Sequence, residues 1–531
     1  MGARPCRSFA CGRRFWRLER AAVMVAFVGV LKGGAAMFGG RQVRYLVTAE
    51  EMRFYEKFTV DTVGIAEEVL MERAALAAFA RVQAYLREHP DRGRDILVMA
   101  GMGNNGGDGL ALARLLAEAD CRVEVWCVGD ESRASGQWRR QRGILGYCPV
   151  SFSNKPLRDE YTVMVDALLG TGLSREVDGA FGEAVEHFQR LLGYRLALDL
   201  PSGIDSDNGS VWGRAVCADE TVTFGFCKRG LALYPGCERA GKVTTADIGI
   251  SPAALAEKTP GTFALEGEPE ELLPKRSPRG NKGTFGKVLL AAGSFNMAGA
   301  AILSARAAYR AGAGMVKVIT VPENREILQG AVPEALLGTP GELREGMEWA
   351  DVIAIGPGMG TGGTAREMLV TVLQESSLPL LMDADALNLL AADRELREMT
   401  AACGRAGRSI VLTPHVGELA RLTGRNVEEI KEDLAARGGE LAMELQAVTV
   451  AKDARTFICA PGRPTCINLS GNSGLATAGS GDVLAGMVAG LMAQGMDTFH
   501  AACVGAYLHG RAGDRVAAGI GEHACMAGDL V

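Results

Sequence analysis

Short, continuous apolar runs alternate with helix-like segments along most of this 531-residue chain. In the first half such runs occur at residues 95–100, 121–128, 161–169 and 195–200. Runs that are apolar throughout, and not only at every second position, are typical of strands buried on both faces. With helices between them, they predict a parallel sheet that is covered by helices on each side.

The same alternation restarts after a charged, proline-containing stretch at residues 265–280, which we interpret as a linker. The sequence therefore predicts an α/β protein with two doubly wound domains, at residues 45–264 and 281–531. A length of roughly 100–200 residues per domain agrees with this division. Strands of the second domain are expected at 287–292, 315–321, 351–355, 379–382, 409–412 and 448–451.

The first 44 residues do not continue this alternation. A basic stretch at 1–20 and an apolar run at 21–31 resemble a signal peptide, but Glu19 beside the apolar run does not fit one. We expect residues 1–44 to be a disordered leader or to precede a mis-assigned start. The organised chain is expected to begin near Tyr45.

Charge and cysteine content narrow the class of partner. The formal net charge is −6, from 57 basic and 63 acidic residues, which argues against nucleic acid as the main partner. Thirteen cysteines without a Cys-x-x-Cys pair argue against a disulfide scaffold or a zinc ribbon. They favour reduced thiols in a cytoplasmic protein. No apolar stretch reaches the roughly 20 residues of a membrane helix, so we expect no membrane partner.

A glycine-rich loop, Gly-Met-Gly-Asn-Asn-Gly-Gly-Asp-Gly at 101–109, lies between a predicted strand and a predicted helix. Open α/β sheets bind ligands at this place, and a helix N-terminus attracts anions such as a dinucleotide phosphate. Asp166 and the Asp199–Gly203 segment follow two further strands and are expected at the same crevice. Side-chain oxygens of an Asn, an Asp and a Ser there suit an alkali or alkaline-earth cation.

These motifs, with Thr48–Met52 and Leu70–Arg73, resemble those of the NAD(P)H-hydrate epimerase family over roughly residues 45–250. The resemblance implies a Rossmann-like domain that interconverts the R and S forms of hydrated NADH and NADPH. It also implies that Asp199 does acid/base work and that Asn105, Asp166 and Ser202 hold a potassium ion. The implied hydrate-binding residues are Asn104, Asn105, Gly106, Gly107, Asp108, Gly170, Thr171, Gly172, Leu173, Ser174, Arg175, Glu176 and Asp199.

The strongest signal of the second domain is the glycine-rich segment at 472–486, which contains Ala478-Gly-Ser-Gly-Asp482. At a helix start, its backbone N–H groups can form an anion hole for a transferring phosphoryl group. Asp482, in the first helical turn, can accept a hydroxyl proton. His415 ends another strand, where we expect it to contact a ligand, and Lys452–Thr456 follow the 448–451 strand and can contact a nucleotide.

These segments, with 282–286 and 299–303, resemble the ribokinase-like superfamily, and within it the ADP/ATP-dependent NAD(P)H-hydrate dehydratase family, over roughly 270–525. The resemblance implies that ADP or ATP phosphorylates the hydroxyl of the hydrate and that phosphate is then eliminated. Asp482 would remove the hydroxyl proton, and phosphoryl transfer from a nucleotide normally needs Mg²⁺. The implied hydrate-binding residues are Ala300, Gly358, Gly360, His415 and Asp482, and the implied nucleotide-binding residues are Lys452, Asp453, Ala454, Arg455, Thr456, Gly479, Ser480 and Gly481.

Together the two resemblances predict a fused repair enzyme that is a homo-oligomer, in which an epimerase feeds the R hydrate to a dehydratase that acts on the S form. Three alternatives stay open. A ribokinase-like small-molecule kinase with an N-terminal binding domain shares the Gly-Ser-Gly-Asp segment. An epimerase-like domain can serve as an inactive binding module. An NAD-dependent dehydrogenase is disfavoured by the imperfect Gly-x-Gly-x-x-Gly match at 101–106 and by the lack of an acidic residue ending the next strand.

Overall fold

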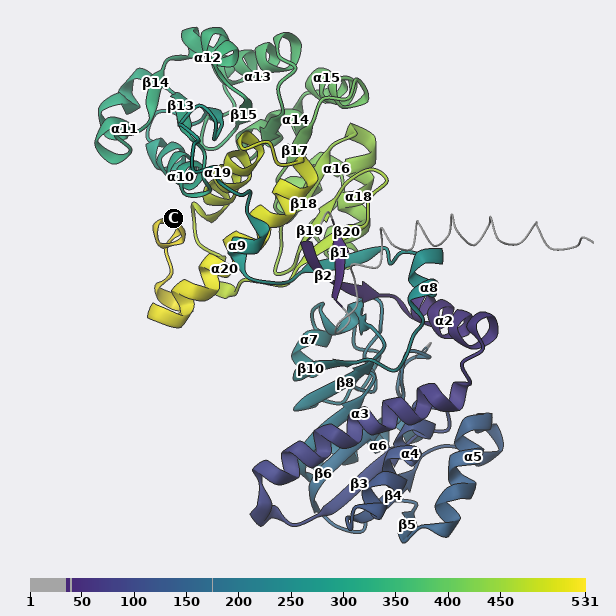
Figure 1. The fold of residues 1–531 in the computed structure, drawn as a ribbon. Helices are drawn as coiled ribbons and strands as arrows, with labels where there is room; N and C mark the ends of the chain where they lie inside the picture. Colours follow the sequence, from purple (N-terminus) through teal and green to yellow (C-terminus); the bar gives the residue numbers. More distant parts are fainter. Residues whose placement is uncertain (1–34, 39–40, 174) are drawn as a thin grey trace, which may run out of the picture.

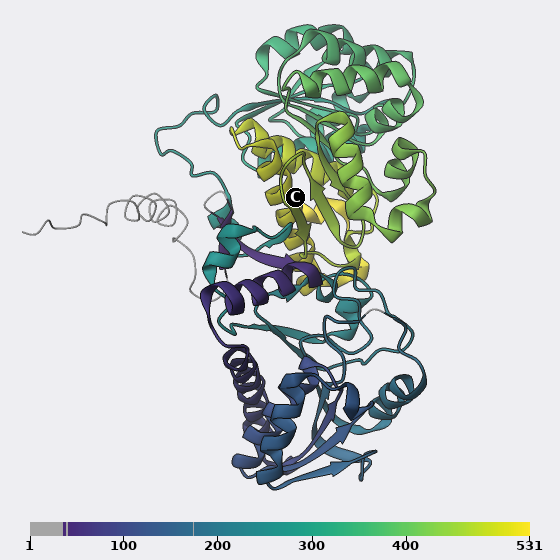
Figure 2. The same cartoon turned by 90° about the vertical axis from the view of Figure 1, so that its right-hand side faces the viewer.

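The structure, a computed structural model, describes residues 35–38, 41–173 and 175–531. The chain forms two lobes, one on either side of a narrow junction (Figures 1 and 2). Each lobe has a sheet with helices on both faces, which confirms the predicted pair of doubly wound domains. Most of the expected leader, residues 1–34 and 39–40, lies outside the described residues.

The sheet of the first lobe has parallel pairings throughout its described strands. Four of its strands confirm the apolar runs of the sequence, and the β3 strand begins and ends where it is predicted. The strand order is β10 (Lys242–Ala246), β8 (Glu220–Phe224), β7 (Leu192–Leu198), β6 (Glu160–Ala167), β3 (Asp95–Ala100), β4 (Arg122–Cys127) and β5 (Val150–Ser153).

Both faces of this sheet are covered because successive side chains of a strand point to opposite sides. Ile96 and Val98 of β3 pack with α3 (Glu67–Glu88), α4 (Asn104–Glu118) and α5 (Gly136–Ile144). Leu97 and Met99 pack on the other face, with α6 (Gly179–Arg190). The continuous apolar run thus reflects burial on both sides.

A helical segment precedes α3 and lies at the junction of the lobes. Thr48 and Glu51 form a capping box that starts α2 (Ala49–Lys57). A π-helical turn, η1 (Phe58–Val63), continues α2 and ends at Gly64, whose φ of +88° interrupts the helix as predicted. The short helices α7 (Gly236–Arg239) and α8 (Pro252–Glu257) complete this lobe.

The sheet of the second lobe is parallel through its centre and ends in an antiparallel hairpin. The strands predicted between 287 and 451 are confirmed, whereas the hairpin β19–β20 was not predicted. The strand order is β14 (Leu336–Gly338), β13 (Met315–Ile319), β12 (Lys287–Ala291), β15 (Val352–Ile355), β16 (Leu380–Met382), β17 (Ile410–Leu412), β18 (Val448–Ala451), β19 (Thr456–Cys459) and β20 (Thr465–Asn468).

Three helices rich in small residues cover one face of this sheet: α10 (Ala298–Arg310), α19 (Ser480–Ala493) and α20 (Thr498–Ile520). Small residues are required there, because a Cβ on Gly486 would lie 2.2 Å from the Ser304 carbonyl oxygen. Helix α11 (Arg325–Ala331) joins the same side through Leu328. The other face carries α12 (Leu343–Trp349), α13 (Gly363–Glu375), α14 (Asp385–Ala392), α15 (Arg394–Arg405), α16 (Val416–Thr423), α17 (Val427–Glu432) and α18 (Leu434–Leu445).

The lobes do not follow the predicted boundaries strictly. β2 (Arg41–Val47) and β11 (Thr262–Leu265) flank the first lobe in sequence but pair with each other and extend the sheet of the second lobe. β1 (Ala35–Phe38) and β9 (Cys227–Lys228) both pair with β2. The described strands therefore begin at Ala35, before the expected start near Tyr45, and the expected linker contains the short helix α9 (Pro269–Leu272).

An apolar cluster continues across the junction. Leu200, Leu231 and Ala232 of the first lobe belong to the same buried cluster as Phe457 and Ile467 of the second. The lobes are thus joined by packed side chains as well as by strands. Within the described part of the chain, no helix has the length and apolarity needed to cross a membrane.

Candidate functional site

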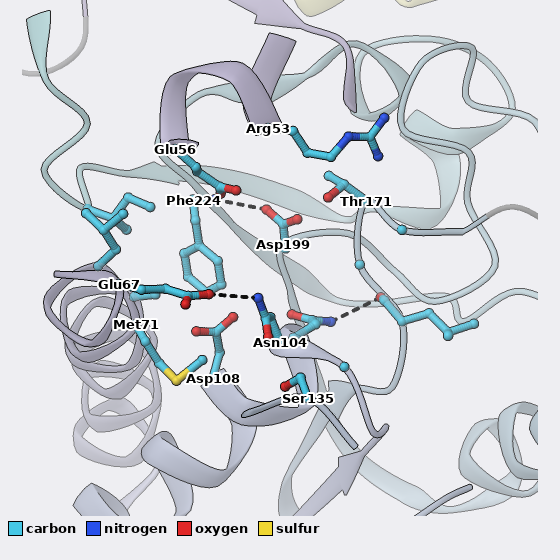
Figure 3. Close-up of a pocket in the computed structure, with 18 of the residues that line it drawn as sticks. Arg53, Glu56, Glu67, Met71, Asn104, Asp108, Ser135, Thr171, Asp199 and Phe224 are labelled. Atoms are coloured by element: carbon cyan, nitrogen blue, oxygen red, sulfur yellow. Dashed lines mark hydrogen bonds between the residues drawn. The ribbon is translucent and has the colours of Figure 1, made fainter. Parts of the chain in front are cut away.

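The first lobe has a cavity of about 740 Å³ at the carboxyl ends of β3, β6 and β7, which are neighbours in the sheet. We call it the first-lobe cavity. The α4 N-terminus, the loop after β6 and Asp199 after β7 line it, together with residues of α2 and α3 (Figure 3). Three segments that are far apart in sequence therefore meet where the sequence predicted a ligand.

The glycines of the 101–109 loop allow the backbone to approach closely. A Cβ on Gly101 would lie 1.9 Å from the Leu168 carbonyl oxygen, and one on Gly106 would lie 1.8 Å from the Gly101 oxygen. The helix α4 consequently starts at Asn104, inside the glycine-rich loop and six residues earlier than predicted. Asn104 reaches across the cavity, where its amide donates to Glu67 at 3.1 Å.

Asp199 has an unusual conformation and an unusual partner. Its φ is +66°, a region that non-glycine residues rarely adopt. The ammonium of Lys228, a side chain with only 1% of its surface exposed, donates to Asp199 Oδ1. Thr223 Oγ1 and the Phe224 N–H donate to the same oxygen at 3.4 and 3.3 Å. This carboxylate is therefore held firmly at the cavity wall.

Further carboxylates face Asp199 across the first-lobe cavity (Figure 3). Burial raises the pKa of Glu56 to about 7, against the opposing charge of Lys228 and with a smaller contribution from the charge of Asp199. Burial and the charges of Asp199 and Glu56 raise the pKa of Asp108 well above its usual range. Such perturbed carboxyl groups in a cleft are typical of acid/base sites.

Asn105, Asp166 and Ser202 come together beside this cavity. Ser202 donates to both oxygens of Asp166, from Oγ at 2.6 Å and from N at 2.7 Å. Asn105 donates through Nδ2 to the Leu169 carbonyl at 3.1 Å, while its Oδ1 is buried without a hydrogen-bond partner. Ser202 Oγ also lies 3.3 Å from the Leu169 carbonyl, so this carbonyl links Asn105 to the Ser202–Asp166 pair. A buried oxygen without a partner near other oxygen groups fits a hard cation.

The predicted first-lobe residues divide into three groups. Asn104, Asn105, Asp108, Asp199 and the segment 170–172 line the cavity. Gly106 and Gly107 are buried in α4, Leu173 packs against α6, and Ser174 lies outside the described residues. Arg175 and Glu176 are exposed and are not among the described residues that line the cavity.

In the second lobe, the N-terminus of α19 meets the carboxyl ends of β16, β17 and β18. Gly479 precedes α19 with a φ of +89°. A Cβ on Gly481 would lie 3.4 Å from Lys452 Nζ, which places this ammonium beside the first turn of the helix. The helix terminus and the lysine together form an anion-binding corner, because both favour negative charge.

A network of charges surrounds this corner. Lys452 Nζ donates to the buried Asp383 carboxylate at 3.1 Å, and Thr413 Oγ1 donates to the same oxygen at 2.6 Å. Burial, and next the charge of Asp383, raise the pKa of Asp482 to about 7. An aspartate with a pKa near neutrality is suited to accept a proton during catalysis.

A second cavity, of about 770 Å³, opens beside this corner, and we call it the second-lobe cavity. Lys452, Asp453, Ala454, Thr456, Ser480 and Gly481, all predicted to bind a nucleotide, line it. Gly479 lies at the start of α19, where a Cβ would lie 2.5 Å from a Leu303 methyl carbon. Arg455 instead points to the junction, where Nε donates to the Ala232 carbonyl at 2.9 Å.

The residues predicted to bind the hydrate in the second lobe lie at neighbouring strand ends. Gly358 and Ala300 are in contact, since a Cβ on Gly358 would lie 2.8 Å from that of Ala300. The Gly360 N–H donates to Asp385 at 2.8 Å. His415 lines the second-lobe cavity and also caps α16, accepting from the Gly417 N–H at 3.0 Å through Nδ1.

Sequence reasoning missed two residues at these sites. Lys228 carried one signal, a lysine directly after the apolar stretch 224–227, which is where a buried charge needs a partner. His509 is buried on α20 and contacts Ser480 at 3.0 Å, and burial lowers its pKa to about 4. Its distance of 29 residues from Ser480 gave no local signal.

Comparison with known proteins covers both lobes. A family model described as YjeF-related protein N-terminus matches residues 67–230, and the NAD(P)H-hydrate dehydratase model matches residues 288–530. A solved structure of the ADP/ATP-dependent NAD(P)H-hydrate dehydratase from Bacillus subtilis is 30% identical over 50% of this chain and 93% of its own, with a TM-score of 0.42.

Full-length relatives match nearly the whole chain. The bifunctional NAD(P)H-hydrate repair enzyme of Moorella thermoacetica is 36% identical over 92% of this chain and 95% of its own length. The enzymes of the same name from Coxiella burnetii and Escherichia coli are 37% and 34% identical, over 90% and 91% of this chain. With a first-lobe and a second-lobe cavity both in place, this chain belongs to the family of bifunctional NAD(P)H-hydrate repair enzymes.

Proposed function

We propose that the two lobes act in sequence on hydrated NADH and NADPH. The first lobe interconverts the R and S epimers, and the second dehydrates the S epimer with ADP or ATP as phosphoryl donor. One observation carries this proposal: a chain of this family has, at the carboxyl edge of each of its two sheets, a cavity with charged and polar side chains in its lining. Cavities of about 740 and 770 Å³ match the usual size of small-molecule sites.

In the first lobe, Asp199 is the proposed acid/base residue. The hydrate carries its hydroxyl on a ring carbon bonded to nitrogen, and epimerisation requires a bond at that carbon to open and reform. A group that removes and returns the hydroxyl proton promotes both directions. Lys228, Thr223 and Phe224 all donate to Asp199 Oδ1, so we assign Oδ2 to the hydrate. Asn104, Asp108 and the 170–172 loop are positioned to hold the ligand.

Asn105, Asp166 and Ser202 are the proposed potassium ligands. The unpartnered Asn105 Oδ1 supports this assignment, because a buried amide oxygen without a partner is costly unless a cation or a donor satisfies it. The ion would fix the loop after β6 against the start of α4. Replacing K⁺ by the bulky cation choline should slow epimerisation and leave dehydration of pure S hydrate unchanged; equal rates in both salts would refute the assignment.

In the second lobe, Asp482 is the proposed base that removes the hydroxyl proton of the hydrate. The oxygen then attacks the terminal phosphoryl group of ADP or ATP, and phosphate subsequently leaves, which restores the dihydropyridine ring. Hydroxide is a poor leaving group and phosphate a good one, so the phosphorylation makes the elimination possible. We assign stabilisation of the transferred group to the helix start at Gly479–Gly481 and to the Lys452 ammonium beside it.

Mg²⁺ is proposed as the companion of the nucleotide. No group of three or more His, Cys, Asp or Glu side chains in the described residues forms a metal cage. A nucleotide-bound Mg²⁺ needs only one or two carboxylates, because phosphates and water supply its other ligands. Asp383 and Asp385, on either side of Ala384 with its φ of +48°, are the carboxylates we assign to it. The ion would neutralise charge on the phosphates.

The deciding experiment follows absorbance in the NADH band after adding protein, Mg²⁺, K⁺ and ADP to a mixture of R and S NADH hydrate. Complete recovery that is faster than spontaneous epimerisation supports both activities. Recovery that stops after the S fraction indicates a silent first lobe. No recovery with ADP or ATP, together with a stable phosphorylated product from another alcohol, favours the small-molecule kinase.

Two further features stay predictions. We propose that the protein is a homo-oligomer, which light scattering on the purified chain tests directly. We also propose a cytoplasmic location, supported by free cysteines at all eleven described positions. A disulfide found in the native protein by mass spectrometry would contradict that location.

A further inference from the structure

The second-lobe cavity is lined by one residue of the first lobe, Tyr234. All its other lining residues lie between His415 and His509. Tyr234 is 47% exposed, although it lies at the junction of the lobes. A half-exposed aromatic ring at the wall of a cavity offers a flat apolar surface to the ligand that fills that cavity.

The position of Tyr234 is fixed by contacts with the second lobe. The preceding residues Leu231 and Ala232 are buried in the apolar cluster that crosses the junction. Arg455 donates from Nε to the Ala232 carbonyl at 2.9 Å and from Nη1 to the Leu469 carbonyl at 3.2 Å. Its guanidinium also lies 5.0 Å from the centre of the Tyr234 ring, within cation–π range.

The contacts of Arg455 in this structure are thus with groups at the junction. The Arg455 guanidinium contacts two carbonyl groups and the tyrosine ring. Arg455 also lines a separate cavity of about 310 Å³ between the lobes. Arg455, which the sequence predicts to bind the nucleotide, contacts the tyrosine that lines the second-lobe cavity.

The lining of the second-lobe cavity combines charged and apolar residues. Lys452, Ser480 and Gly481 form the phosphate-binding corner at the α19 N-terminus. Tyr234 and Val427 of α17 supply exposed apolar surface elsewhere in the same lining, and Asp453 and Ala454 connect the two along the chain. A nucleotide has the same two parts, because its phosphates are anionic and its base is flat and apolar on both faces.

We propose that Tyr234 of the first lobe completes the nucleotide site of the second lobe by stacking on the base of ADP or ATP. This inference rests on the proposed nucleotide-dependent dehydration and adds a first-lobe residue to its nucleotide site. Docking of the first lobe then sets the nucleotide affinity of the second. Helix α7, which follows Tyr234 in sequence, lies at this junction in Figure 1.

The test uses the full-length protein and measures binding by calorimetry. Aromatic stacking on a base is worth enough that Tyr234→Ala should raise the Kd of ADP about tenfold, while Tyr234→Phe keeps it within about twofold. Inorganic pyrophosphate, which lacks a base, should bind both variants as it binds the wild type. Tyr147→Ala, at a tyrosine that is 95% exposed, is the matched control and should bind ADP normally.

Two results would overturn the inference: an unchanged Kd of ADP in Tyr234→Ala, or an equal loss of ADP and pyrophosphate binding, which indicates a collapsed site. Epimerisation should stay at its wild-type rate in Tyr234→Ala. Failure of the proposed function shows separately, because Asp482→Asn would then still dehydrate the hydrate. A wild-type protein that does not bind ADP at all would refute both proposals.

Discussion

The two lobes place their sites in the same way but equip them differently. Each site lies at the carboxyl ends of parallel strands, beside a helix that starts in a glycine-rich segment. In the first lobe the helix start presents side chains, Asn104, Asn105 and Asp108. In the second lobe the helix start is the glycine-flanked turn Gly479–Gly481, which carries little side-chain bulk and lies next to Lys452.

This difference matches the chemistry proposed for each lobe. An epimerisation moves protons and no phosphate, so it needs carboxyl groups whose positions are held by other side chains. A phosphoryl transfer needs positive potential without bulk, which a helix start and a lysine provide. The same fold edge can thus serve two reactions, because the residues at the helix start decide what is bound.

The largest expected effect separates the lobes completely. Asp482→Asn removes the proposed base, so dehydration of S hydrate with ADP should fall by about 10²–10⁴-fold while epimerisation is unchanged. The measurement follows NADH absorbance for dehydration and chromatography of the two epimers for epimerisation. Glu348→Gln, at an exposed acid on α12, is the control and should change neither rate. Loss of both activities in Asp482→Asn would contradict separable sites.

The pH dependence of the dehydration sharpens that prediction. With the pKa of Asp482 raised to about 7, only a minority of the protein carries the ionised base below neutrality. The kcat of the wild-type protein should therefore rise about tenfold per pH unit below pH 7 and level off above it. A profile that is flat from pH 5 to 8 would point to another base.

Asp199→Asn is the converse experiment. Epimerisation should fall by about 10²–10³-fold, because the amide cannot exchange the hydroxyl proton, while dehydration of pure S hydrate continues at its wild-type rate. Asp91→Asn, at an exposed acid of the same lobe, should leave epimerisation intact. A slower dehydration in Asp199→Asn would show that the two sites are coupled through the junction.

Substitution of Lys228 tests whether the Asp199 carboxylate in the first lobe is stabilised mainly by its ion pair with this lysine. Lys228→Met removes the buried cation and leaves Asp199 without its partner, which should cost about 3 kcal/mol of unfolding free energy. The double variant Lys228→Met/Asp199→Asn removes both charges and should recover much of that loss in chemical denaturation. If the double variant is as unstable as Lys228→Met, packing of the lysine stem and not the charge is responsible.

The strands of both lobes could be predicted because their local pattern is strong. Val448–Ala451 and Asp95–Ala100 have the predicted bounds, since a fully buried strand must be apolar throughout. The start of α4 was misplaced because glycines at 106, 107 and 109 are poor helix formers, and tertiary contacts override that preference.

Pairings between distant segments could not be predicted. β2 and β11 are more than 210 residues apart and join the sheet of the other lobe, and no local pattern records which edge a strand will extend. The same reason hid Tyr234, which reaches the second-lobe cavity only because the junction brings it there. Residues such as Asp482 and Asp199 could be proposed from the sequence because each lies in a local motif next to its own strand or helix.

The smallest expected effect concerns stability and again compares the lobes. Asp482 has a pKa near 7 in the folded protein and an ordinary one, near 4, when unfolded. Between these values the unfolded chain is ionised while the folded carboxyl is still protonated, so the contribution of this group to stability is lost as pH rises toward 7. Asp482→Asn has no such loss, and its thermal midpoint should exceed that of the wild type by a few °C at pH 8 but match it at pH 4.5.

Glu348→Gln should show no such pH-dependent difference, because its side chain is exposed. A gap between Asp482→Asn and the wild type that is the same at both pH values would mean that the carboxyl is not strained by burial. A gap that grows with pH would show that the second lobe keeps its base near neutrality at a cost in stability, whereas the first lobe offsets the charge of Asp199 with Lys228.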